Sequence, residues 1–387
     1  MSHYIPHGRG ARVTIRFLLR TLVVTGMLRP LFDAHLDLAW SALFFNRDLT
    51  QSVREIRCRE LGMTDERARG RNTVSLPELR KAGVRVCVAT LLARGGPEQK
   101  NQAAYKRTDL DYANPTHAYS IAHAQLAYYR MLERQGHVKM LRTRGDLDAH
   151  WELAGQDPAA PLGIILSMEG ADPIVTPGQV EEWWNLGLRA VGLAHYGRGQ
   201  YAYGTGVSGP LSAGGRELLG QFQRIGMILD VTHLCDQSMA EALDLFDGPA
   251  LASHHNCRAL VSGDRQLDDG QIVRLVKRGA VIGVALDAWM LYPNWVRGET
   301  KPEVIGLTAV ADHIDHVSQL AGNASHSAIG SDLDGGFGAE QTPRDLNTIA
   351  DLQKLADILS ARGYTDPHID GIFHANWMRF FRDALPD

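Results

Sequence analysis

The most constraining feature of the sequence is a series of eight short apolar runs that alternate with helix-like segments. The runs cover residues 31–38, 84–92, 164–168, 190–194, 227–232, 249–253, 280–287 and 327–331. Strands that alternate with helices are parallel strands joined by helical crossovers. The runs are nearly continuous in apolar residues, which is typical of strands buried on both faces. Eight such units predict an α/β fold of the (β/α)8, or TIM, barrel type.

The segments between the runs carry helical spacing of apolar residues and helix-capping residues. They predict helices at residues 75–80, 117–135, 180–186, 216–225, 236–245, 304–320 and 342–363, one that ends at 277 and one that starts at 366. We expect Ser75 and Asp236 to be N-caps, and either Asp268 or Asp269 to cap the helix that ends at residue 277. Residues 40–72 are predicted to form a long charged excursion with some helix, which is either a solvated segment or a cover for the barrel mouth.

Length and composition limit the domain organisation. The chain has 387 residues, 44% hydrophobic and 22% charged, which is ordinary globular composition. Two or three domains are possible, but a single barrel with insertions also fits, and we expect one domain over residues 29–387. Residues 1–28 are predicted to be an extension outside the core. Their apolar stretch is interrupted by Arg20 and is too short to cross a bilayer, and a targeting segment is the alternative.

Charge and cysteine usage narrow the class of partner and the compartment. The formal net charge of -4 gives no sign of a nucleic-acid or anionic-membrane partner. The four cysteines show no CxxC spacing, so we expect reduced thiols and no disulfide framework. We therefore predict a cytoplasmic protein with no membrane anchor.

Polar side chains that can do chemistry stand where the apolar runs end. They are His35, Asp37, Glu169, His195, His233, His254 and Asp332. In a parallel barrel these ends meet at one mouth, which is where the active site lies. His35 and Asp37 are two residues apart in a strand, so their side chains share a face.

Imidazole nitrogens and carboxylate oxygens are the ligands that Zn²⁺ prefers. A carboxylate such as Glu169 can bridge two ions, and two metals about 3.5–4 Å apart form a clamp for hydrolysis. A single strand-end histidine is usually a hydrogen-bonding residue, but several that converge predict a metal site. We choose His254 over His255 because adjacent strand residues point to opposite sides. His313 and His316 share a helix face, which predicts a solvated surface.

Several motifs resemble those of a known family. They are residues 33–40 (DAHLDLAW), 168–170 (MEG), 230–233 (DVTH), 253–254 (SH) and 330–335 (GSDLDG). In order and spacing they resemble the membrane dipeptidase (renal dipeptidase) family, peptidase family M19 of the amidohydrolase superfamily. The resemblance runs from about residue 30 to the C-terminus. The spacing His-x-Asp at residues 35–37 also argues against amidohydrolase branches that open with His-x-His.

The resemblance implies a binuclear zinc (β/α)8 hydrolase. By position, His35 and Asp37 would hold one zinc ion, and Glu169 would bridge both ions. His233 and His254 would hold the second ion. A metal-bridging hydroxide would attack the peptide carbon of a dipeptide. A possible homodimer is a further expectation from the family.

The resemblance also implies roles for three residues around the metals. His195 would contact the scissile carbonyl oxygen, Arg265 would bind the substrate carboxylate, and Asp332 would pass a proton to the leaving amine. From spacing alone Arg265 is equally well a surface charge. Asp334 is the other acid beside Asp332, and the resemblance selects Asp332. The implied activity is that of a zinc-dependent dipeptidase (EC 3.4.13.19-like).

Two loops depart from the family pattern and leave the substrate open. Residues 169–173 (EGADP) and 196–203 (YGRGQYAY) should lie near the substrate side chains. The dipeptides cleaved, and whether D-residues are accepted, do not follow from the sequence. One alternative is a related amidohydrolase that acts on a lactone or a peptide-like metabolite. Another is a catalytically silent barrel that serves as a binding protein.

Overall fold

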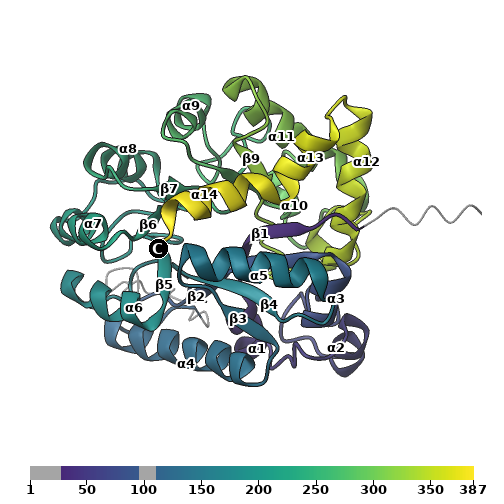
Figure 1. Cartoon of the computed structure of the whole chain (residues 1–387), viewed down its shortest axis with the longest axis horizontal. Coiled ribbons are helices and arrows are strands. Elements are labelled where there is room, and N and C mark those ends of the chain that lie inside the picture. Colours follow the sequence, from purple (N-terminus) through teal and green to yellow (C-terminus); the bar gives the residue numbers. More distant parts are fainter. Residues whose placement is uncertain (1–27, 96–109) are drawn as a thin grey trace, which may run out of the picture.

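The structure is a computed structural model that describes residues 28–95 and 110–387. These residues fold around a curved parallel sheet with helices on its outside (Figure 1). The predicted N-terminal extension lies outside the described residues except for Leu28. The fold is a TIM-barrel-like α/β fold, as the eight apolar runs predict.

Each predicted strand is present, and the strands pair in chain order. They are β1 (Leu31–Leu36), β2 (Val84–Leu92), β4 (Leu162–Glu169), β5 (Leu188–Gly192), β6 (Ile228–Asp230), β7 (Ala250–Leu251), β8 (Ile282–Val284) and β9 (Ser327–Ile329). The first six form one parallel sheet, and β8 pairs with β9. A bridge from Ala252 to Ile282 joins the two sheets. The amide of Asp332 donates to the carbonyl of His35 (3.2 Å), which brings the end of β9 back to β1.

Most helices lie on the outside of the strands, whereas the last one crosses the N-terminal end of the barrel (Figure 1). The helices are α1 (Leu38–Phe44), α2 (Val53–Arg59), α3 (Leu76–Lys81), α4 (Pro115–Arg134), α5 (Arg144–Gln156), α6 (Val180–Leu186), α7 (Ala213–Ile225), α8 (Asp236–Leu245), α9 (Asp269–Lys277), α10 (Ala288–Leu291), α11 (Thr308–Ala321), α12 (Lys354–Ala361), α13 (Asp366–Asp370) and α14 (Asn376–Ala384). Every helix that the sequence predicts has a counterpart here. The short 3-10 turns are Pro177–Gln179, Pro302–Val304, Ala339–Gln341 and Ile349–Gln353, and Gly371–Ala375 is a π-helical turn.

Helices α1 and α10, strand β3 and helix α5 were not predicted. Strand β3 (Val138–Met140) pairs in parallel with the first half of β4, and α5 follows it. Thr143 and Asp146 form a capping box at the start of α5. This Thr-x-x-Asp spacing is a helix-start signal that was present in the sequence.

Several helix boundaries differ from the prediction because tertiary contacts replace local ones. Helix α8 has Cys235 as its N-cap, whereas Asp236 is its first residue and forms an ion pair with Arg258 (2.7 Å). Helix α9 is capped by Asp268, which accepts from the amide of Gln271.

Two other helices begin later than predicted. Helix α11 begins at Thr308 and not at residue 304, and the segment after residue 342 becomes helical only at Ile349. The two irregular segments bond to each other, since the amide of Leu307 donates to Asp345 (2.8 Å).

The prediction of a solvated surface around His313 is wrong. His313 is buried, and its Nδ1 accepts a hydrogen bond from the amide of Cys257 (3.0 Å). Only His316 on the same helix reaches the edge, where it pairs with Asp269 (2.7 Å). His313 therefore joins α11 to the loop after β7.

An apolar core fills the barrel and closes its N-terminal end. Helix α14, yellow in Figure 1, lies across the strands. Phe381 of α14 stacks on Phe32 of β1 at 5.2 Å between ring centroids. The Nε1 of Trp377 donates to the carbonyl of Ile329 (2.9 Å). Because this end is packed, the opposite end of the barrel is the one that can hold a site.

Asp334 ties Arg47 of the charged excursion, and the residues that directly follow the excursion, to the barrel. Its Oδ1 accepts from the amide and hydroxyl of Thr73 (2.7 and 2.8 Å), and its Oδ2 accepts from the amide of Val74 (3.0 Å). Asp334 is buried, and Arg47 Nη1 lies 3.7 Å away. The other acid of this loop is thus a structural residue, and part of the excursion is packed and not solvated.

We expect Asp334→Ala to destabilise the protein by about 3–5 kcal/mol, because it leaves the buried amides of Thr73 and Val74 and the Thr73 hydroxyl without their partner. Arg47 loses a nearby carboxylate but keeps its ion pair with Glu60 (2.7 Å). Thermal and urea unfolding midpoints measure this change. Asp148→Ala is the control, since its ion pair with Arg382 is exposed and contributes little. Equal midpoints for both variants would contradict the assigned role.

The described residues give two further findings. All four cysteines are free, as predicted. Among the helices of residues 28–95 and 110–387, none combines the length and apolar character needed to cross a membrane.

Candidate active site

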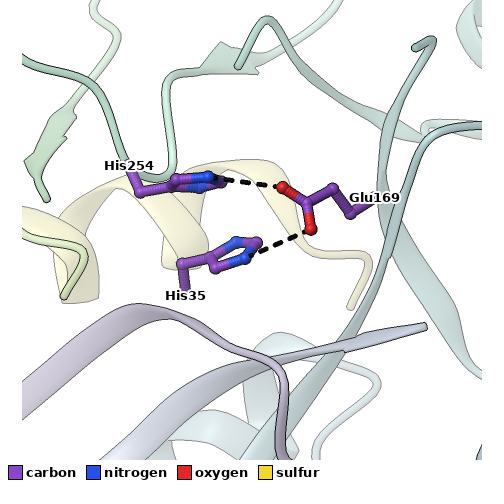
Figure 2. A group of neighbouring side chains, drawn as sticks. All are labelled: His35, Glu169 and His254. Atoms are coloured by element: carbon purple, nitrogen blue, oxygen red, sulfur yellow. Dashed lines mark ion pairs between the residues drawn. The ribbon is translucent and has the colours of Figure 1, made fainter. Parts of the chain in front are cut away.

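Glu169 stands at the centre of the polar end of the barrel. It is the last residue of β4 and is buried. Its Oε1 lies 3.0 Å from His233 Nε2 and 3.3 Å from His254 Nε2. Its Oε2 lies 3.6 Å from His35 Nε2, and Figure 2 shows the His254 and His35 rings one above the other, each facing one oxygen of the carboxylate. His195 Nε2 is 3.8 Å from Oε1. Four predicted histidines therefore converge on one predicted carboxylate.

Hydroxyl groups hold the far nitrogens of these rings. Thr205 Oγ1 is 3.0 Å from His233 Nδ1. Ser253 Oγ is 2.9 Å from His254 Nδ1 and 3.4 Å from His35 Nδ1. A partner on Nδ1 fixes the ring and leaves Nε2 to face the centre.

We expect Thr205→Val to weaken metal binding by about 10–100-fold, because the His233 ring loses the hydroxyl that orients it. Competition with a chromophoric chelator measures the affinity. Thr348→Val is a matched control, since Thr348 contacts none of the candidate ligands and its hydroxyl bonds to Glu78 (3.2 Å). Equal affinities for the two variants would show that the hydroxyl does not orient His233.

Asp37 and Thr90 form the opposite side of the site. Asp37 follows β1, is buried, and has an oxygen 3.7 Å from His35 Nε2. The hydroxyl of Thr90 donates to Asp37 Oδ1. The hydroxyl of Tyr129 donates to the carbonyl of Thr90 (3.0 Å) and accepts from the amide of Ala39 (3.1 Å). Asp37 is thus positioned by β2 and by α4.

Asp332 is brought to the same centre by the turn after β9. Its Oδ1 lies 3.8 Å from His35 Nε2. A glycine is required three residues later, at Gly335, because a side chain there would collide with Asp332 Oδ1. His233 and Asp332 have φ values of 68° and 58°, in the left-handed region that is unusual for residues other than glycine. Such backbone strain clusters at functional sites.

The site is an electrostatically unfavourable arrangement without a cation. Burial raises the pKa of Glu169 and raises that of Asp332 well above its usual range. Burial, with nearby Arg265, holds the pKa values of His233 and His254 well below normal. Burial also lowers the pKa of His35, but Glu169 and Asp37 outweigh it and raise that pKa well above normal.

These donors fit a divalent cation. Three overlapping groups have ligand atoms close enough to share an ion: His35, Glu169 and His254; Glu169, His195 and His233; His35, Asp37 and Asp332. Within the described residues, the buried Nε2 of His35 has no hydrogen-bond partner. Neutral imidazoles and buried carboxylates are the donors that metal ions such as Zn²⁺ take.

A cavity of about 330 Å³ opens above this group. Its walls include Glu169, His195 and Asp332, and Arg265. Arg265 is 1% exposed, and its Nη2 donates to the carbonyl of His254 (2.9 Å). Its Nη1 has no partner among the described residues. Arg265 is therefore not a surface charge, and a buried guanidinium with a free nitrogen can receive an anionic group.

Sequence reasoning missed other residues of this cavity. They are Trp40, Leu92, Arg94, Leu110, Asp287, Trp289, Met290, Arg297 and Gly336. Tyr196 also lines the cavity, and it belongs to the loop 196–203 that is predicted to lie near the substrate. The sequence did contain a signal for Asp287, because this residue ends the seventh apolar run just as the predicted site residues stand at the ends of other runs. Trp289 and Arg297 belong to the connection after that run, where no spacing marks them.

Comparison with known proteins agrees with this geometry. The sequence profile of the membrane dipeptidase family (peptidase family M19) matches residues 25–385. The chain belongs to the M19 family. Dipeptidase tcpJ of Claviceps purpurea is 29% identical over 51% of this chain and 45% of its own length. Dipeptidase 3 of Macaca fascicularis is 24% identical over 64% of this chain and 50% of its own length. The M19 chain spans about half the length of these two curated relatives.

Solved structures share the fold. A metallopeptidase from Rhodobacter sphaeroides, crystallised with a phosphinate mimic of the dipeptide L-Ala-D-Ala, superposes with a TM-score of 0.72 at 20% identity. The superposition covers 92% of this chain and 99% of that one. The probable dipeptidase PvdM of Pseudomonas aeruginosa gives a TM-score of 0.71 at 18% identity, over 92% and 96% of the two chains.

Proposed function

We propose that this M19 protein is a dipeptidase that depends on two zinc ions. The observation that carries the proposal is the pairing of a multi-histidine carboxylate centre with a buried arginine in one cavity. Glu169 lies within 3.8 Å of four imidazole Nε2 atoms, and Arg265 lines the same cavity with a free nitrogen. Hydrolysis needs the first feature, and recognition of a free C-terminal carboxylate needs the second.

His35 and Asp37 are proposed to hold one zinc ion, and His233 and His254 are proposed to hold the other. Glu169 is proposed to be a ligand of both ions. All five side chains are buried, so bulk water does not compete with them for a bound ion. Bound zinc would supply Lewis-acid polarisation and would make water a nucleophile near neutral pH.

His195 and Asp332 are proposed to act on the substrate. Burial lowers the pKa of His195 well below normal, so the ring is neutral and carries one N–H. That N–H can donate to the carbonyl oxygen of the scissile bond as negative charge develops on it. Asp332 faces the same cavity and is proposed to accept a proton from the attacking water and return it to the leaving amine.

The cavity restricts substrate length. Arg265 sits at a buried wall, so the carboxylate it binds must end the chain. The volume of about 330 Å³ suits a small ligand. The phosphinate mimic of a dipeptide bound by the Rhodobacter sphaeroides relative supports this substrate class.

A panel of dipeptides, tripeptides, dipeptide amides and lactones, assayed with zinc-loaded and chelator-treated protein, tests the proposal. We expect cleavage of dipeptides only, lost with the chelator and restored by zinc. Lactone hydrolysis without dipeptide cleavage would overturn the dipeptidase assignment. Metal-independent cleavage would overturn the metal centre.

We expect Arg265→Met to reduce kcat/KM for dipeptides by about 30-fold or more, since removing one partner of a buried charge pair costs about 2–5 kcal/mol. The loss should appear mainly in KM, because the carboxylate is bound both before and during the reaction. Steady-state kinetics measure the effect. The control is Arg258→Met on the same loop, whose ion pair with Asp236 is at the surface. Loss in kcat alone would contradict the assigned role.

A further inference from the structure

The active-site cavity holds one carboxylate that the proposed mechanism does not use. Of the four acids among its described lining residues, Asp37, Glu169 and Asp332 face the proposed metal centre. The fourth, Asp287, lies just beyond β8, on a different part of the wall. It is 7% exposed.

The barrel places Asp287 beside the catalytic turn. The amide of Leu286 donates to the carbonyl of Ser331 (3.0 Å), so the residues that follow them, Asp287 and Asp332, come from neighbouring strand ends. Both side chains line the cavity. A substrate in reach of Asp332 is therefore close to Asp287 as well.

One oxygen of Asp287 is fixed and the other is available. Gln341 Nε2 donates to Oδ1 (2.8 Å), and the amide of Trp289 approaches the same oxygen (3.4 Å). Within the described part of the chain, no hydrogen bond reaches Oδ2, and no lysine or arginine nitrogen lies within 4.0 Å of the carboxylate. The nearby Arg297 of the cavity wall donates to the carbonyl of Gly336 (2.7 Å).

A buried carboxylate with no cation in contact is unfavourable, and burial raises the pKa of Asp287 to about 7, although the Gln341 hydrogen bond and the charge of nearby Arg297 act in the opposite direction. A dipeptide is a zwitterion that carries one cation and one anion. Arg265 accounts for the anion. Among the described lining residues, Asp287 is the acid left to meet the ammonium group, with which a carboxylate forms strong charge-assisted hydrogen bonds.

We propose that Asp287, oriented by Gln341, binds the free α-ammonium group of the dipeptide. The inference deepens the proposed function, on which it rests for the identity of the substrate. It adds a requirement at the other end of the substrate, because Arg265 selects a free C-terminus and Asp287 a free N-terminus. Substrates without the amine should be cleaved poorly.

A cycle that changes the enzyme and the substrate together tests this pairing. Ala-Ala and its des-amino analogue, propionyl-alanine, are assayed with wild type and with Asp287→Asn, which keeps an oxygen for Gln341. We expect each single change to lower kcat/KM by about 30-fold or more, and the two together to lower it no further. If Asp287→Asn cleaves propionyl-alanine at the same rate as wild type does, that result would also show that the variant is folded. Equal losses on both substrates would assign Asp287 a structural role and overturn the proposal.

Glu299→Gln is the matched control, since it removes an exposed carboxylate from the same connection between β8 and α11. We expect it to leave both substrates unaffected. If it reproduces the loss, the effect comes from general charge and the proposal fails.

Calorimetric binding of an Ala-Ala phosphinate and its des-amino form separates this inference from the proposed function. Amine-dependent binding that disappears in Asp287→Asn, with no dipeptide cleavage by wild type, would overturn the dipeptidase activity and support the ammonium site. Cleavage with an amine preference that survives in the variant would overturn the ammonium site alone. Neither cleavage nor amine-dependent binding would overturn both.

Discussion

Glu169→Gln is expected to reduce kcat/KM by at least about 10³-fold, because it removes the one carboxylate shared by both proposed ions, and metal polarisation is worth several kcal/mol. His233, His254 and His35 all turn their Nε2 atoms to this carboxylate. Glutamine has the same shape but a neutral amide, so the bound metal should fall along with the rate. Elemental analysis after dialysis, together with kcat/KM, measures both effects.

Glu152→Gln is the control for Glu169→Gln. Glu152 is exposed on α5 at the packed end of the barrel, and its substitution should leave metal content and rate unchanged. Wild-type metal content and activity in Glu169→Gln would contradict the proposed bridge.

Asp332→Asn is expected to lower kcat by about 10²–10⁴-fold, which is the usual contribution of a positioned general acid–base group. KM should change little, since the proposed proton transfer belongs to the transition state and not to binding. Bound metal should stay at the wild-type level, because the proposed ligands are untouched. Pre-steady-state and steady-state kinetics with elemental analysis test these three expectations.

Asp334→Asn gives a sharp comparison with Asp332→Asn. Asp334 is two residues away and also buried, but its oxygens are occupied by Thr73 and Val74. We expect it to reduce stability and to keep activity below its unfolding temperature. Loss of metal in Asp332→Asn would instead show that Asp332 is a metal ligand. Its Oδ1 lies 3.8 Å from His35 Nε2, which is close enough for the two to share an ion.

Much of the polar centre could be predicted from the sequence, because local patterns identify the strands and the barrel topology brings the ends of the strands together. Each apolar run predicted a strand, and parallel strands bring their ends together. His35, Glu169, His233 and His254 were predicted in this way, and they do converge. The preference for His254 over His255 agrees with this grouping, since His254 faces Glu169.

Residues in connections were harder to predict because no periodicity constrains them. Arg265 is in a loop, and only the family resemblance singled it out. The buried guanidinium of Arg265 is held by a hydrogen bond to the carbonyl of His254, which is a tertiary contact that spacing does not reveal. Helix spacing predicts a solvated surface at His313 because it carries no information on the loop after β7 that covers this side chain.

The sequence by itself determined the alternation of strands and helices and the residue types at the strand ends, since both follow from short-range pattern. Only the tertiary structure decided which polar residues share the cavity. Asp287 and Asp334 are both buried acids near the same end of the barrel. Asp287 lines the cavity, whereas both oxygens of Asp334 accept hydrogen bonds from Thr73 and Val74. The physical reason is that a carboxylate's role depends on the donors around it, and those donors come from segments distant in the chain.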